Sequence, residues 1–201
     1  MPTTGTTGTT VSSTTAAPDT TAGGSGPDSA ALAAGMLAPV DLGGFYRIND
    51  PYAAALLATA PCLAGVGAAQ VQDGRAFTGL IVPGGHPAVV EVAVSFPGSG
   101  SAEVFQSVNA ALTSCTSFSA DLGGTEVSLP IVPEQVPAVG DASAAYSGKF
   151  SVAGGSESLQ VAVVLDGKIV LLVVYIDTVP PSNAIYGDLP STVGAAIGKL
   201  A

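Results

Sequence analysis

The clearest pattern of apolar and polar positions lies in the last third of the chain. Two runs rich in Val, Leu and Ile, 159–165 and 168–176, flank Asp166-Gly167, and the second run is apolar on both faces. Asp-Gly between such runs is a strong hairpin signal, because a type I′ turn needs positive φ at both central residues. The pattern predicts a hairpin whose second strand is central and covered on two sides.

Two further strands are expected. Apolar and polar residues alternate in segment 89–96, which is typical of a half-buried strand. Its apolar face holds Val90, Val92, Val94 and Phe96, and its polar face holds Glu91 and Ser95. Another antiparallel strand is expected at 146–152, before a Gly-Gly pair.

An amphipathic helix is expected to begin at Ser101 as the N-cap, with Glu103 in its first turn. Its apolar positions follow the helical period and are Val104, Val108, Ala111, Leu112 and Cys115. The last turn of this helix should therefore present Cys115 on the buried face.

Three other segments have weaker helical signals. Asp50-Pro51 is a helix start, and the Ala/Leu run after it should end at Pro61. A segment from Ser182 is interrupted by Pro190, and Val193, Ile197 and Leu200 form the apolar stripe of its second half. Residues 32–42 contain Gly35 and Pro39, which predicts one short helical piece or an irregular entry segment.

This order of elements predicts an α+β fold, an antiparallel β-sheet with helices packed mainly on one face. The folded domain should cover residues 31–201. Residues 1–30 contain no aromatic residue and only two charges, and they begin with slipping Thr-Gly-Thr-Thr repeats. Such a segment buries too little apolar surface to offset the entropy of ordering, so we expect a disordered Thr/Ser/Gly-rich tether.

Charge and hydropathy exclude several classes of protein. Five basic residues against 15 acidic ones give a net charge of -10, which argues against a nucleic-acid partner. The longest run of bulky apolar residues, 169–176, is far shorter than the roughly 20 residues of a membrane span. The first residues, Met1-Pro2-Thr3, lack the basic and apolar regions of a signal peptide.

The two cysteines, Cys62 and Cys115, fit one disulfide better than a metal site. There is no CxxC motif, and the single histidine, His86, cannot complete a tetrahedral set without carboxylate ligands, for which no motif argues. A disulfide would indicate an oxidising compartment outside the cytoplasm. Two buried free thiols remain the alternative.

The chain offers little material for catalysis. His86 lies in a Gly/Pro-rich loop, but no G-x-S-x-G elbow supplies a nucleophile. Most carboxylates stand at turns and helix starts, where local backbone hydrogen bonds explain them. The Gly-Gly pairs lack the context of a phosphate loop. We therefore expect no catalytic residue, no metal and no cofactor.

Several short motifs over residues 36–201 together resemble a known protein family. These motifs are an acidic-apolar entry segment at 36–42, Pro61-Cys62-Leu63, Phe96-Pro97, a helix ending at Cys115, Val139-Gly140-Asp141, the Val-rich hairpin and the C-terminal segment 195–200. On these motifs the chain resembles the PknH-like extracellular sensor domain, found at the outer end of a mycobacterial receptor serine/threonine kinase and in many mycobacterial lipoproteins.

This resemblance implies an antiparallel sheet packed with helices, a cleft for an unidentified ligand and no enzymatic activity. The family's usual second disulfide has no counterpart here, since 159–176 contains no cysteine. The chain is in this respect more similar to the lipoprotein branch. Its Thr-rich leader fits that branch, and contact with a membrane is expected only through a lipid anchor that this sequence does not contain.

We therefore expect a non-catalytic, extracytoplasmic domain of a cell-envelope lipoprotein. It would bind a small or lipidic envelope ligand, or a protein partner, in a cleft beside the sheet. The polar groups proposed for the rim of that cleft are Arg47, Arg75, His86 and Tyr146. Two alternatives stay open: an envelope hydrolase acting on esters or glycans, and a surface interaction protein whose core is filled.

Overall fold

Seven antiparallel strands form one curved sheet in the order β1-β2-β3-β9-β8-β7-β6. The structure is a computed structural model, and it describes residues 24–48, 62, 70–83, 85–115, 118–121, 126–135, 138–152, 155–181 and 187–200. The sheet strands are β1 (Tyr46–Ile48), β2 (Gly74–Ile81), β3 (Ala88–Ser95), β6 (Val132–Glu134), β7 (Ala142–Val152), β8 (Gly155–Asp166) and β9 (Ile169–Val179). A separate hairpin joins β4 (Phe118–Asp121) to β5 (Glu126–Leu129).

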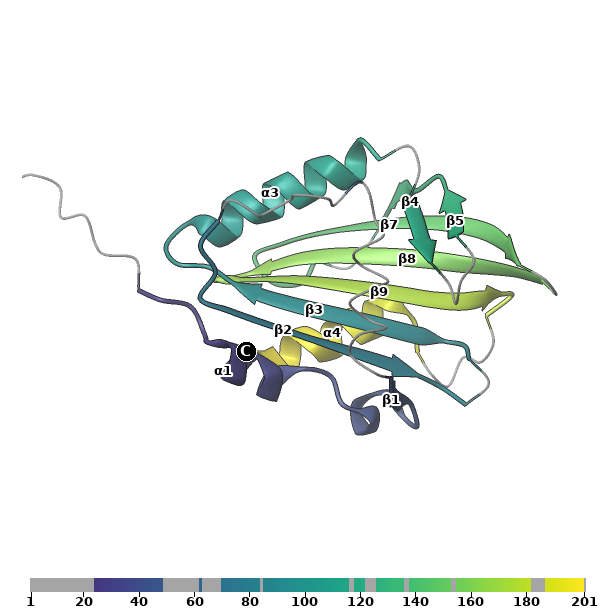
Figure 1. Cartoon of the computed structure of the whole chain (residues 1–201), viewed down its shortest axis with the longest axis horizontal. Helices are drawn as coiled ribbons and strands as arrows, with labels where there is room; N and C mark the ends of the chain where they lie inside the picture. The colour runs from purple at the N-terminus through teal and green to yellow at the C-terminus, as the bar shows by residue number, and fades with distance from the viewer. Residues whose placement is uncertain are drawn as a thin grey trace, which may run out of the picture.

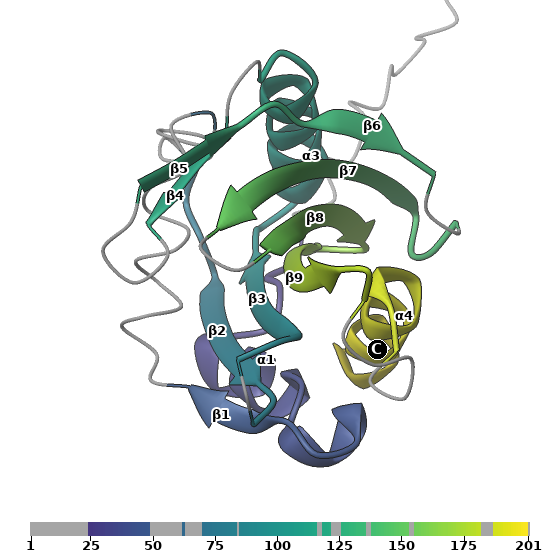
Figure 2. The same cartoon turned by 90° about the vertical axis from the view of Figure 1, so that its right-hand side faces the viewer.

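Helices cover both faces of the sheet. Helix α3 (Gly100–Thr113) lies on one face, and α1 (Ser29–Gly35), the 3₁₀ helix η1 (Pro39–Leu42) and α4 (Leu189–Leu200) lie on the other, as Figures 1 and 2 show. The predicted α+β class is confirmed, and most of the helices share one face as expected. Strands β6 to β9 curve around α4 (Figure 2).

Strand β9 stands at the centre of the sheet, as the doubly apolar run predicted. Alternate residues face opposite sides: Val174 and Ile176 pack in the core under α3, whereas Val173 and Tyr175 pack in the core under α1 and α4. A strand with two apolar faces is stable only if both are covered, and this requirement explains the three-layer arrangement.

The predicted hairpin is confirmed, but the predicted type I′ turn is wrong. Asp166 pairs with Ile169, so the central turn residues are Gly167 and Lys168. Gly167 has a φ of 54°, while no described non-glycine residue has a positive φ. Positive φ at the first central position alone is the pattern of a type II′ turn. Asp166 is therefore the last residue of the strand and the first of the four turn residues, and it does not occupy a central position of the turn.

The strand at 89–96 is confirmed as β3, but it is not half-buried. Glu91 and Ser95 on its polar face are both 0% exposed. They are covered because the N-terminal segment folds over this face: the Ser95 hydroxyl donates to the Pro27 carbonyl, and one Glu91 oxygen accepts from Leu37 N.

The long amphipathic helix is confirmed as α3, but Ser101 is not its N-cap. Ser99 occupies that position. Ser101 is buried in the first turn, and its hydroxyl donates to the Gly167 carbonyl over 2.9 Å. The serine therefore ties α3 to the β8–β9 turn.

The chain from Gly24 onward contacts the sheet, although residues up to 30 were assigned to the tether from composition. Gly26 N donates to Asp73, Arg75 N donates to the Ser29 hydroxyl, and Lys168 donates to the Ser25 carbonyl. A side chain at Gly74 would collide with this segment, since an added Cβ would lie 2.5 Å from the Asp28 carbonyl carbon. For residues 1–23, which lie outside the described residues, the tether stays a prediction.

The expected entry segment at 32–42 is resolved into α1 and η1. Pro190 was expected to interrupt the last helix, but it is the second residue of α4. Proline is favoured there because its fixed φ suits the first turn and no backbone N–H is needed. The helix expected after Asp50-Pro51 and the start of the last segment near Ser182 lie outside the described residues.

Cys62 and Cys115 form the predicted disulfide, with their Cα atoms 5.7 Å apart and a sequence separation of 53. Cys115 is buried in the core under α3, at the end of that helix, as its spacing predicted. The bond therefore fixes the region after β1 to the α3 layer.

Replacing both cysteines with alanine should lower the free energy of unfolding by about 4 kcal/mol, the loop-entropy value for this separation. Urea denaturation followed by circular dichroism measures the change. The wild type with a reducing agent should show the same loss, and the double variant should not respond to the reductant. An unchanged transition midpoint in the reduced wild type would contradict this role.

Candidate functional site

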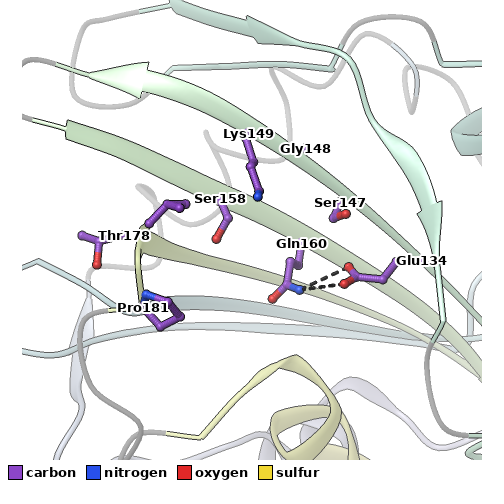
Figure 3. A pocket seen from close by; sticks show the side chains of 9 residues that line it. Glu134, Ser147, Gly148, Lys149, Ser158, Gln160, Thr178 and Pro181 are labelled. Carbon is purple, nitrogen blue, oxygen red and sulfur yellow. Dashed lines mark hydrogen bonds between the residues drawn. The ribbon is translucent and has the colours of Figure 1, made fainter.

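A polar pocket with a volume of about 210 Å³ opens on the α4 face of the sheet, toward the end where β7 turns into β8 (Figure 3). Four strands contribute to it, together with the segment after β9. Its lining residues are Glu134, Ser147, Gly148, Lys149, Ser158, Gln160, Thr178, Val179 and Pro181.

The floor of the pocket consists of two cross-strand pairs. Ser147 lies opposite Gln160, and Lys149 lies opposite Ser158. Directly opposite residues in an antiparallel pair share one face, so these four side chains project together. The same face is apolar further along the strands, where Ala145 and Ala162 are buried in the core that includes α4 residues. The pocket begins where this apolar pattern ends.

Two opposite charges lie on different sides of this pocket (Figure 3). The Glu134 carboxylate accepts from Gln160 Nε2 through both oxygens, at 3.3 and 3.2 Å. Over the described residues, the ion pairs join His86 to Glu157 and Lys199 to Asp41, so neither Glu134 nor Lys149 is neutralised. The pocket therefore keeps one anionic and one cationic group available.

Hydroxyl groups complete the polar lining. The Ser158 hydroxyl makes one long hydrogen bond, 3.4 Å, to the Asp177 carbonyl. The Thr178 hydroxyl donates to the Pro180 carbonyl over 2.8 Å and is committed to that local turn. Ser158 therefore retains hydrogen-bonding capacity toward the pocket, whereas Thr178 serves mainly the backbone.

The residues proposed from sequence as a cleft rim do not form one site. Arg47 lies in the edge strand β1, opposite Leu80, and its side chain lies outside the described part of the chain. Arg75 is exposed near the start of β2. His86 lies at the other end of the β2–β3 hairpin, where its Nε2 is 3.0 Å from Glu157 Oε1.

Tyr146 is buried under α3, on the face opposite the pocket. Its hydroxyl donates to Asn109 Oδ1 over 2.7 Å and lies 2.7 Å from Thr113 Oγ1. These contacts join β7 to α3, which gives the side chain a structural role in the observed fold.

The pocket residues were missed from sequence, although a signal was present. Ser147 and Lys149 in one strand, and Ser156, Ser158 and Gln160 in the next, put polar residues at every second position of otherwise apolar strands. Such alternation marks one polar sheet face. Glu134 gave no such signal, because only the sheet order places β6 beside β7.

A second unusual group is Glu91, a carboxyl buried in the core between the sheet and the N-terminal segment. One oxygen accepts from Leu37 N over 2.8 Å, while the other, like the hydroxyl of its cross-strand neighbour Thr78, has no hydrogen-bond partner among the residues that the structure describes. Burial raises its pKa to about 7, against the lowering effects of Leu37 N–H and of Lys199. Asp41, 2.6 Å from Lys199, adds a smaller raising effect.

Because the folded-state pKa of Glu91 lies above its unfolded value, ionisation should destabilise the fold. Stability should fall as pH rises from about 5 to 8, by up to about 3 kcal/mol for a shift of this size. Urea denaturation at pH 5, 6, 7 and 8 measures the slope. Glu91→Gln should flatten it, because glutamine keeps the acceptor for Leu37 N without ionising. Equal slopes in both proteins would refute the assignment.

The described residues contain no group of three or more His, Cys, Asp or Glu side chains that could hold a metal ion. Among the helices of the described residues, none has the length and apolar character needed to cross a membrane. Neither finding identifies a ligand, so the polar pocket is the main candidate site.

The fold is similar to that of a solved extracellular domain. The crystal structure of the extracellular domain of PknH from Mycobacterium tuberculosis matches with a TM-score of 0.57 and 16% sequence identity, over 87% of this chain and 94% of that one. No protein-family profile and no curated protein sequence matches the chain. The comparison therefore supports the PknH-like fold expected from the motifs, at the level of structure alone.

Proposed function

We propose that this chain is a non-catalytic, extracytoplasmic sensor-like domain that binds a small polar ligand in the pocket between Glu134 and Lys149. The observation that carries the proposal is the pocket itself, where the two cross-strand pairs give a polar floor on a sheet face that is mainly apolar under α4. Ligand sites typically place a few convergent polar groups in a concavity of this kind.

A polar ligand fits this site better than a lipid. The two apolar faces of the sheet are packed against helices, and their side chains are buried in the two cores. The pocket, in contrast, is lined by a carboxylate, an ammonium group, an amide and hydroxyls. Burying an acyl chain against these groups would desolvate them without replacing their hydrogen bonds.

Location outside the cytoplasm is supported by two separate observations. The Cys62–Cys115 disulfide is typical of an oxidising compartment. The fold is shared with a domain described as extracellular. We further propose that the natural protein is a cell-envelope lipoprotein, with the Thr-rich N-terminal segment as the spacer between anchor and domain.

Ligand binding is tested by titrating the ¹⁵N-labelled full chain with a polar-metabolite extract of the source organism. We expect saturable amide shifts at Gly148, Lys149, Ser158 and Gln160. Gln160→Ala should weaken binding at least fivefold, whereas Ser107→Ala, on the exposed face of α3, should not change it. Shifts confined to another surface, or a lipid retained in native mass spectrometry, would contradict the proposal.

The non-catalytic assignment has its own test. His86 and Glu157 supply two members of a hydrolytic triad, 3.0 Å apart. We expect hydrolysis of p-nitrophenyl acetate at the rate of buffer alone, and the same rate for His86→Ala. Turnover above background that disappears in His86→Ala would instead establish the hydrolase alternative.

A further inference from the structure

The charges of the pocket narrow the class of its ligand. Resting on the proposed function, we infer that the pocket binds a small zwitterion of the α-amino-acid type, with its ammonium group at Glu134 and its carboxylate at Lys149. The inference depends on the separation of the two charges, on the absence of an ion-pair partner for either of them among the described residues, and on the size of the pocket.

The separation follows from the strand register. Glu134 lies opposite Ala145, and Lys149 is four residues further along β7. At about 3.3 Å per residue, the two backbone positions are roughly 13 Å apart along the strand. The side chains reach inward from both sides of the pocket, with Ser147 and Gln160 near the space between them (Figure 3). The charges are too far apart for an ion pair, so a ligand can lie between them.

The charges also decide which ligands fit poorly. An anion without an ammonium group would be attracted by Lys149 but repelled by Glu134, and an amine without a carboxylate would meet the opposite conflict. A neutral polyol would leave both charges partly desolvated without a counter-charge. A zwitterion supplies a counter-charge both for Glu134 and for Lys149.

Glu134 and Lys149 are the charged residues among those that line the pocket. Asp177 lies opposite Ser158, but it is buried, and its Oδ1 accepts from Thr178 N over 2.7 Å. Gln160 directs its amide nitrogen to Glu134, which holds that carboxylate in place and keeps the amide oxygen as an acceptor. Glu134 and Gln160 together therefore offer several acceptors for the three N–H bonds of an ammonium group.

The size of the pocket sets an upper limit. A cavity of about 150 Å³ holds benzene, so 210 Å³ fits on the order of ten non-hydrogen atoms. This is the size of a single amino acid. A longer peptide would have to extend beyond the pocket.

The test is an amide-shift titration of the ¹⁵N-labelled full chain with the twenty common L-α-amino acids and D-alanine. Matched probes separate the two charges: propionate is alanine without its ammonium group, and ethylamine is alanine without its carboxylate. D-glucose serves as the neutral polyol. We expect at least one amino acid to shift the amide signals of Gly148, Lys149, Ser158 and Gln160. Its Kd should be at least tenfold lower than that of any matched probe.

The variants Glu134→Gln and Lys149→Met should each weaken that binding at least tenfold. Glu103→Gln on α3 and Lys168→Met at the β8–β9 turn are the controls and should leave it unchanged. Propionate, ethylamine or glucose binding as tightly as every amino acid would overturn the zwitterion inference but keep the proposed function. If neither these probes nor the metabolite extract shifts the pocket, both are overturned.

Discussion

The fold depends on the burial of both faces of β9. Its residues alternate between two cores and are apolar on each side, so a helical layer must cover the sheet above and below. Helix α3 supplies one layer, and the disulfide holds the end of that helix. The two ends of the described chain supply the other layer, since α1 and η1 come from the N-terminal side and α4 from the C-terminal side. Segments distant in sequence thus become neighbours because one strand has no polar face.

This second layer is held by polar contacts as well as by packing. Lys199 of α4 lies 2.6 Å from Asp41 of η1, and Glu91 of β3 accepts from the backbone of Leu37. The carboxyl of Glu91 is therefore placed at the junction of the sheet and the N-terminal segment. A buried carboxyl group lowers stability when it is charged. Because Glu91 contacts the backbone of Leu37, its protonation state should affect how the N-terminal segment docks on the sheet.

The candidate site arises where the second layer ends. Under α4 the concave face of β7 and β8 carries alanine and valine, and beyond α4 it carries serine, lysine and glutamine. The same strands thus contribute both to the core and to the candidate site. Strands β6 to β9 are curved (Figure 2), and residues of all four strands line the pocket. The chain has only five basic residues against 15 acidic ones, and Lys149 is one of the five. Its presence in the pocket therefore distinguishes this site from the rest of an acidic protein.

The sequence by itself determined the local elements and the central position of β9. Apolar periodicity predicted the β8–β9 hairpin, the strand β3 and the helix α3, because these patterns reflect contacts within each element. It also placed Cys115 on a buried face. The tertiary structure alone decided that Glu91 is buried, that Tyr146 serves the core and that Glu134 lies beside Gln160. These facts depend on which distant segments lie next to each other, and a local pattern of polar and apolar residues does not encode that information.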